Sequence, residues 1–96
     1  MPRINDNDPP RDSITIGLAA LAATLGCERR AQRFIDLTGI GTDELRRRAG
    51  EPSLLAALLR FLEAHEPDLL SVSDALGAKP QDLVEARQQL EREGTR

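Results

Sequence analysis

Two groups of arginines are the residues in this sequence best suited to bind another molecule. Residues 27–50 carry six arginines against four acidic residues; the arginines are Arg29, Arg30, Arg33, Arg46, Arg47 and Arg48. Guanidinium groups bind carboxylates and phosphates through paired hydrogen bonds. Consecutive helical residues point about 100° apart, so one face cannot present a whole triplet. We therefore expect solvated arginines near helix C-termini, where the helix dipole favours cations. The alternative is a patch that joins Arg29 and Arg33 to Arg46 or Arg47 and binds an acidic partner.

Residues 72–87 have the layout of a helix-turn-helix motif, with one helix ending at Gly77 and a second beginning at Pro80. The small and aliphatic residues that the motif requires around the turn are present as Ser73, Leu76, Ala78 and Leu83. A recognition helix reads DNA with basic and amide side chains. The second helix does offer glutamines, but it also carries the acids Asp82, Glu85, Glu91 and Glu93. We expect a structural hairpin and regard nucleic acid as an unfavourable partner. The alternative is a helix-turn-helix-like DNA-binding module that uses residues 67–93.

No combination of residues points to catalysis, to a cofactor or to a bound metal. His65 is the single histidine, and Glu63 and Glu66 are not spaced to place three ligands on one helix face. Cys27 stands near the start of a predicted helix, where a thiol can become more reactive, but no histidine pairs with it at a motif spacing. Residues 39–41 lack the preceding strand and the lysine of a phosphate-binding loop. We therefore predict a protein that is not an enzyme and that needs no cofactor.

The elements that must position these residues are short helices separated by glycines and prolines. Apolar residues recur at helical spacing, and no run alternates as a strand would. We expect an all-α fold, a compact orthogonal bundle of five or six short helices. The first helix is predicted to be capped by Asp12 or Ser13 and ended by Gly26. The others are predicted at residues 28–38, 52–64, 67–76 and 80–93, with a further short one that Thr42 caps and Gly50 closes. Residues 1–11 are expected to be a disordered leader, residues 12–93 a single helical domain and residues 94–96 a frayed tail.

Two of the predicted helices have informative apolar faces. The first is expected to pack through a stripe within an arc of about 60°, formed by Ile14, Leu18, Leu21 and Leu25. The apolar residues of the helix at 52–64 cover about 200°, more than an ordinary surface helix shows. Either this helix is central and wrapped by the others, or it keeps an apolar surface for a partner. The second interpretation predicts a homodimer interface, or a groove for a partner helix, that uses Ile16, Leu55, Leu59 and Leu62.

The composition indicates one globular domain in a reducing compartment. Hydrophobic residues make up 40% and charged residues 30%, which is typical of a folded chain rather than a disordered one. Phe34 and Phe61 are the only aromatic residues, which disfavours single-stranded nucleic-acid binding because bases stack on rings. One cysteine cannot form an internal disulfide. No stretch has the ~18–20 apolar residues of a membrane span, and the residues before Cys27 match a lipoprotein cleavage site poorly. A cytoplasmic location without membrane association is expected.

Three segments of the chain resemble a known family. They are residues 33–40, 43–49 and 52–62, and their most specific patterns are Phe-x-x-Leu-Thr-Gly and Pro-x-x-Leu-x-x-x-Leu-x-Phe-Leu. Over residues 14–92 the sequence is similar to a family of small alphaproteobacterial proteins catalogued as domain of unknown function three-five-seven-two. The resemblance implies a bacterial cytoplasmic protein and agrees with the all-helical fold, but it brings no activity or ligand. The function that we expect is therefore a non-enzymatic, small helical protein-interaction or regulatory module of unknown partner.

Overall fold

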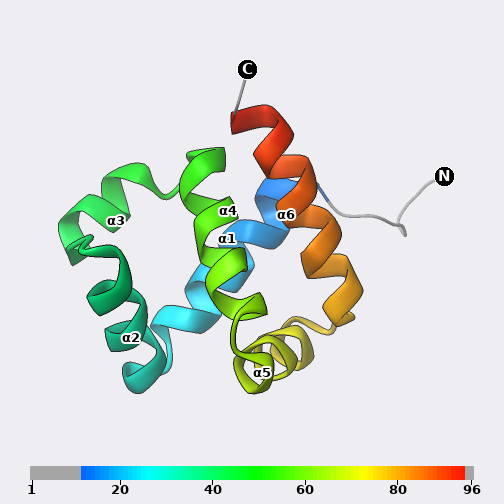
Figure 1. The fold of residues 1–96 in the computed structure, drawn as a ribbon, viewed down its shortest axis with the longest axis horizontal. Helices are drawn as coiled ribbons and strands as arrows, with labels where there is room; N and C mark the ends of the chain where they lie inside the picture. Colours follow the sequence, from blue (N-terminus) through cyan, green and yellow to red (C-terminus); the bar gives the residue numbers. More distant parts are fainter. Residues whose placement is uncertain (1–11, 95–96) are drawn as a thin grey trace, which may run out of the picture.

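The computed structural model describes residues 12–94 and places them in six α-helices, with no strand in this part of the chain (Figure 1). The helices are α1 (Ser13–Leu25), α2 (Glu28–Thr38), α3 (Thr42–Arg48), α4 (Pro52–Glu63), α5 (Glu66–Leu76) and α6 (Pro80–Gly94). They run in several directions around one core, so the predicted all-α bundle is confirmed. The predicted leader at residues 1–11, and residues 95–96 of the predicted tail, lie outside the described residues. Within residues 12–94, no helix has the length and apolar character needed to cross a membrane.

α4 is the central helix of the bundle. It packs against α1, α5 and α6 (Figure 1), and its buried side chains are Leu54, Leu55, Ala56, Leu58, Leu59 and Leu62. The structure therefore agrees with the first of the two interpretations, a helix wrapped by the others. The expectation that Leu55, Leu59 and Leu62 lie on a partner surface is corrected, because all three are 0% exposed. Ile16, the fourth residue of that predicted surface, is half-buried and packs against the core. The wide apolar arc is covered because three helices pack on α4.

α1 packs on the core through its smallest residues rather than through the predicted leucine stripe. Its buried positions are Gly17, Ala20, Leu21 and Thr24. A Cβ atom at Gly17 would lie only 3.0 Å from Cβ of Leu55, so α1 and α4 approach closely at this point. Of the predicted stripe, Leu21 is buried and Ile14 is half-buried, whereas Leu18 and Leu25 are exposed. Small side chains favour this orientation because they allow close contact between two helices.

Two glycines in the left-handed conformation end α2 and α5. Gly39 has a φ of 73° and Gly77 a φ of 68°, values at which residues with a Cβ are strained. After Gly77, the backbone N–H of Ala78 donates to the carbonyl of Ser73 at 2.9 Å. Asp82 then accepts a hydrogen bond from the backbone N–H of Lys79 at 3.0 Å, which helps to fix the start of α6. The predicted cap of α3 is corrected: Gly41 is the N-cap and Thr42 is the first helical residue, with no side-chain cap.

Candidate interaction surface

α2 and α3 form a lobe at one side of the molecule, which we call the α2–α3 lobe (residues 28–48; Figure 1). It contributes only two fully buried side chains, Phe34 and Leu45. The ring of Phe34 meets that of Phe61 on α4 edge to face, with centroids 5.2 Å apart, a favoured geometry for aromatic pairs. Ile35 and Ile40 are partly buried against the same core, whereas Leu37 and the arginines Arg29, Arg46 and Arg47 are exposed.

A buried carboxylate on α5 makes the polar connection between the lobe and the rest of the bundle. Asp68 accepts a hydrogen bond from Nε of Arg30 at 3.1 Å and one from Nη2 of Arg33 at 2.5 Å. Arg30 also donates to the hydroxyl of Ser71, and the guanidinium carbon of Arg33 lies 5.2 Å from the ring centroid of Phe61. A cation at this distance from an aromatic face is attracted to it. Arg33, a predicted partner-binding residue, is therefore engaged within the molecule.

The two arginines determine the charge state of Asp68. Burial is the largest single influence and by itself raises the pKa of this carboxyl. The hydrogen bonds from Arg33 and Arg30, with the positive charge of Arg33, outweigh that effect, and the pKa of Asp68 is lowered from its ordinary value. Asp68 is consequently a stable anion at neutral pH, and it compensates part of the positive charge of the α2–α3 lobe.

The remaining arginines of the lobe differ in what they contact. Arg48 donates to Glu51 at 2.8 Å and to Glu44 at 3.2 Å, and these hydrogen bonds, the Glu51 one first, raise its pKa. Arg46 lies 3.8 Å from Asp43 in a pair that is almost fully exposed, and such pairs contribute little to stability. Within residues 12–94, the side chains of Arg29 and Arg47 make no hydrogen bond or ion pair. These two predicted residues, with Arg46, leave positive charge open to a partner.

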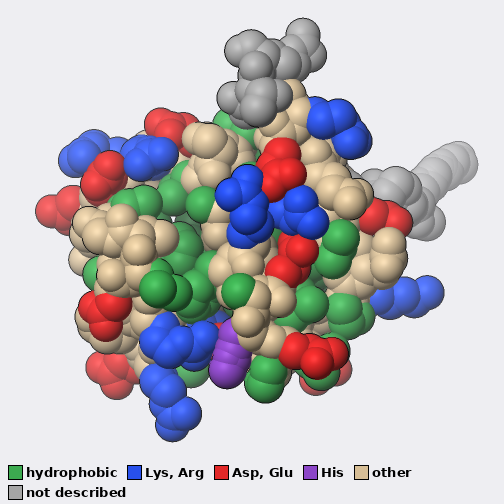
Figure 2. All heavy atoms as spheres, viewed as in Figure 1, with side chains coloured by type: hydrophobic (Ala, Val, Ile, Leu, Met, Phe, Trp, Pro, Cys, Tyr) green, Lys and Arg blue, Asp and Glu red, His purple; other side chains and the backbone are tan. Residues whose placement is uncertain are grey.

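Figure 2 shows how charge and apolar surface are distributed over the lobe. Basic side chains gather over α3 and, separately, over the beginning of α2, with apolar side chains between them. The predicted continuous arginine patch is therefore divided into two basic ends. Leu37 on α2 is the most exposed large apolar residue among those described, at 74%. The lobe thus combines an exposed apolar side chain with basic groups at both ends, an arrangement that suits an acidic, partly apolar partner.

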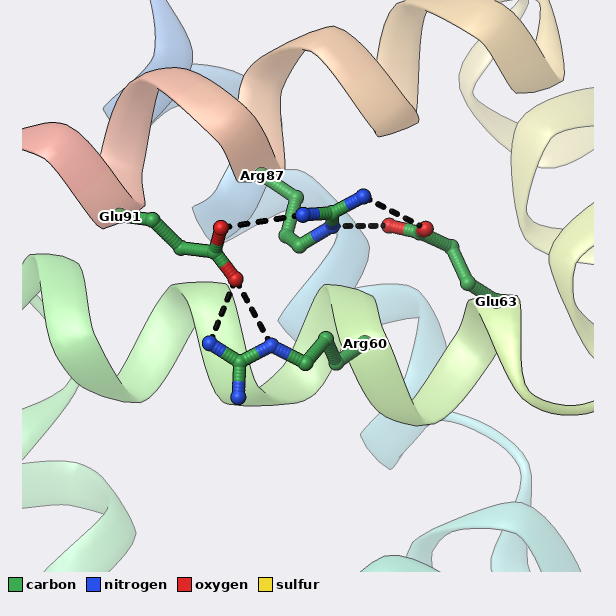
Figure 3. Close-up of polar contacts among 4 residues, drawn as sticks. All are labelled: Arg60, Glu63, Arg87 and Glu91. Carbon is green, nitrogen blue, oxygen red and sulfur yellow. Dashed lines mark hydrogen bonds and ion pairs between the residues drawn. The ribbon is translucent and has the colours of Figure 1, made fainter.

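The surface between α4 and α6 carries a cluster of four charged residues that the sequence interpretation missed (Figure 3). Arg87 donates two hydrogen bonds to Glu63, at 2.7 and 3.1 Å, and a third to Glu91 at 3.0 Å. Arg60 donates from Nε to Glu91 at 2.7 Å. Hydrogen bonding to Arg60 lowers the pKa of Glu91, and hydrogen bonding to Glu63 raises that of Arg87. Positive and negative groups alternate, so this face presents no strong field of one sign.

The charge cluster between α4 and α6 also affects whether the predicted helix-turn-helix could bind DNA. The steric requirements of the motif are met, since Ser73 and Leu83 are buried and Gly77 is left-handed. Arg87, however, directs its guanidinium at Glu63 and Glu91. The exposed amides of α6 also face its own acids: Gln81 donates to Glu85 and Gln89 donates to Glu93. α6 therefore offers duplex DNA few cations for its phosphates.

The two residues first considered for chemistry, His65 and Cys27, each stand at the beginning of a helix. His65 is the N-cap of α5 and Cys27 the N-cap of α2, and Cys27 is a free, half-buried thiol. In the described part of the chain, no three histidine, cysteine or acidic side chains are grouped as metal ligands. The α2–α3 lobe is therefore the best-supported candidate for a functional surface.

Comparison with known proteins identifies the family of the chain. The family model described as "Protein of unknown function (DUF3572)" matches residues 11–93, which confirms the resemblance seen in the sequence. No curated protein and no solved structure matches the chain. The matched residues include both the lobe and the charge cluster, and the family description gives neither a role.

Proposed function

This chain belongs to the DUF3572 family of proteins of unknown function, and we propose that it is a non-enzymatic, cytoplasmic protein-interaction module. In this proposal the α2–α3 lobe binds an acidic segment of a partner protein. The partner places an apolar side chain against Leu37 and carboxylates near Arg29, Arg46 and Arg47. Binding of this kind would make the chain a regulator of its partner rather than a catalyst.

The observation that carries the proposal is the contrast between the lobe and the other charged faces. Leu37 is 74% exposed, and Arg29 and Arg47 have no partner among the described residues. On α4 and α6, by comparison, Arg60 and Arg87 are already paired with glutamates. A new acidic partner gains most where cations are not already compensated. The exposed apolar side chain of the same lobe, Leu37, supplies the remaining affinity, since burying apolar area is favourable.

The test is a comparison of immobilised variants in extract from the native cell. The variants are Leu37→Asp, which removes the apolar contact, and Arg29→Glu with Arg47→Glu, which reverses the free charges. Leu70→Asp is the matched control, because Leu70 on α5 is also exposed, at 49%, but lies outside the lobe. The proposal requires proteins that the wild-type chain and Leu70→Asp retain and both lobe variants lose. Equal retention by all four proteins would contradict it.

The second candidate function is DNA binding through α5 and α6. It is supported by the left-handed Gly77 and the buried Ser73 and Leu83, which reproduce the steric pattern of the motif. The ion pairs of Arg87 with Glu63 and Glu91 count against it. The two functions are distinguished by nucleic-acid binding measurements and by whether variants of α6 or of the lobe abolish the interaction.

A further inference from the structure

Arg33 lies in the middle of a ridge on the outer side of α2. Residues four apart on a helix are neighbours on its surface, so Arg29, Arg33 and Leu37 form one row, which we call the arginine row. α2 lies at the edge of the molecule (Figure 1), and all three side chains are at least partly open to solvent. A partner segment that contacts both Arg29 and Leu37, as in the proposed function, must therefore pass over Arg33.

The guanidinium group of Arg33 is held in place but retains free donors. Asp68 accepts a hydrogen bond from its Nη2, and the ring centroid of Phe61 lies 5.2 Å from its central carbon. A guanidinium group has five N–H donors, and Nε and Nη1 of Arg33 have no acceptor among the described residues. The side chain is 38% exposed. Because contacts on two sides already fix this side chain, an anion that binds its free donors costs little further side-chain entropy.

The charge balance around Arg33 favours an anion as the ligand. Arg30 and Arg33 share the single carboxylate of Asp68, so two positive charges face one negative charge. The charge cluster between α4 and α6 has two arginines and two glutamates, one acid more than the group around Arg33. Arg29, one helical turn before Arg33, makes no ion pair within residues 12–94. A carboxylate placed at Arg33 would therefore meet uncompensated positive charge.

The adjacent row of α2 is unsuited to the same ligand. Glu28, Gln32 and Asp36 are exposed, and the amide of Gln32 donates a hydrogen bond to Asp36 at 2.9 Å. Like charges brought together across an interface are repelled. The two carboxylates of this row therefore confine an acidic segment to the arginine row.

We propose that Arg33 is the anchor of the α2–α3 lobe and binds a carboxylate of an extended acidic segment that lies along the arginine row. This inference rests on the function proposed for the lobe and specifies the partner. Arg29 and Leu37 are eight residues apart on a helix, which places them about 12 Å from each other along its axis. An extended chain covers about 13 Å in four residues and presents every second side chain on one side.

The two spacings define the sequence pattern of the partner. A segment with the order acid, any residue, acid, any residue, leucine places its carboxylates at Arg29 and Arg33 and its leucine at Leu37. A partner helix is disfavoured at this row, because helices pack through an apolar stripe and the row offers one apolar side chain. The central acid of the segment is the one that Arg33 binds.

Titration of the whole chain with a defined peptide tests the proposal. The probe is the pentapeptide Glu-Ala-Glu-Ala-Leu with blocked termini, and the matched control is Glu-Ala-Gln-Ala-Leu. In NMR spectra the side-chain Nε–H signal of Arg33 should shift and saturate with the probe. The control peptide should bind roughly tenfold more weakly, since it lacks the central charge. Equal affinity of the two peptides, or no shift at Arg33, would overturn the proposal.

A substitution at the anchor gives a second test. Arg33→Lys keeps a positive charge opposite Asp68 but lacks the planar set of donors, so it should bind the probe roughly tenfold more weakly than the wild type. Arg60→Lys is the control, because Arg60 lies on α4 outside the lobe, and it should bind as the wild type does. Equal affinity of Arg33→Lys and the wild type would show that Arg33 is not the anchor.

The same titration separates this inference from the function on which it rests. Shifts at Leu37, Arg46 and Arg47 without one at Arg33 would overturn the role of Arg33 and leave an acidic partner at the lobe. The proposed function fails instead when the extract comparison shows equal retention by all four proteins.

Discussion

Arg33 on α2 donates a hydrogen bond to Asp68 on α5, a residue 35 positions later in the chain. Arg30, one helical turn before Arg33, donates to the other carboxylate oxygen of Asp68. The carboxylate is therefore bound by two guanidinium groups, and the polar connection between the lobe and α5 depends on its charge. Because removing a partner from a buried charged hydrogen bond is costly, this relationship has measurable consequences for stability.

Asp68→Asn should destabilise the fold. The amide keeps the shape of the carboxylate but removes the charge that Arg30 and Arg33 contact, and one of their hydrogen bonds loses its acceptor. We expect a loss of about 1–3 kcal/mol in the free energy of unfolding, measured by urea denaturation. Asp74→Asn on the same helix is the matched control, because Asp74 is exposed, and it should change stability little. Equal stability of Asp68→Asn and the wild type would show that the connection is energetically neutral.

The contribution of Asp68 should also depend on pH. Its folded-state pKa is lowered, so the unfolded chain binds a proton at a higher pH than the folded one. The stabilisation is complete above the unfolded pKa of about 3.9 and is lost as pH falls through the lower folded value. The difference in unfolding free energy between wild type and Asp68→Asn should therefore shrink below about pH 4. The other acidic residues are common to both proteins, so their effects on the unfolding free energy largely cancel in this difference. A difference that stays constant down to the pH of acid unfolding would contradict the prediction.

Helix positions could be predicted from the sequence because their signals are local. Gly26, Gly39 and Gly77 end helices, Pro52 and Pro80 begin them, and the helix predicted at 28–38 matches α2. These residues act through their own backbone preferences, which do not depend on the rest of the fold. The all-α class follows from the same signals.

The packing faces and the candidate site could be predicted only in part. The leucine stripe of α1 was the more apolar face, but Gly17 allows an approach to Leu55 that no periodicity reveals. Arg33 was predicted to bind a partner because its acceptor within the molecule, Asp68, is remote in sequence. The pair of Glu63 and Arg87 was missed for the same reason, since 24 positions separate them. Contacts of this kind depend on how helices are arranged, which hydrophobic patterning leaves open.

Gly17→Leu should destabilise the protein through its contact with α4. Even a Cβ atom at this position would lie 3.0 Å from Cβ of Leu55, so a larger side chain must push α1 away from the core. Overpacking of this kind lowers the free energy of unfolding by about 1–3 kcal/mol. We expect to measure it as a lower midpoint of thermal unfolding. Ala75→Leu, an exposed position on α5, is the control for added size and should melt close to the wild type. An unchanged midpoint for Gly17→Leu would mean that α1 does not pack closely on α4.

Leu58→Asp should prevent folding. Leu58 is 0% exposed on the central helix, and an unpaired carboxylate there costs several kcal/mol, against a total stability of about 5–10 kcal/mol. Circular dichroism should show loss of helical signal and of cooperative melting. Leu37→Asp introduces the same charge at an exposed position of α2 and should keep both the helical signal and the cooperative melting. A Leu58→Asp protein with full helicity and a cooperative transition would show that α4 is not the centre of the core.

The last prediction separates DNA binding from protein binding. Duplex DNA favours proteins that neutralise its phosphates, and non-specific complexes have dissociation constants of about 10⁻⁴–10⁻⁶ M. Arg87 is paired with Glu63 and Glu91, and α6 also exposes acids, so we expect no binding tighter than this at physiological salt. Fluorescence anisotropy with labelled duplexes over a salt series measures it. A sub-micromolar complex with a steep salt dependence, lost in Gln81→Ala with Gln88→Ala, would establish α6 as a recognition helix. The functional assignment would then move from the α2–α3 lobe to the hairpin of α5 and α6.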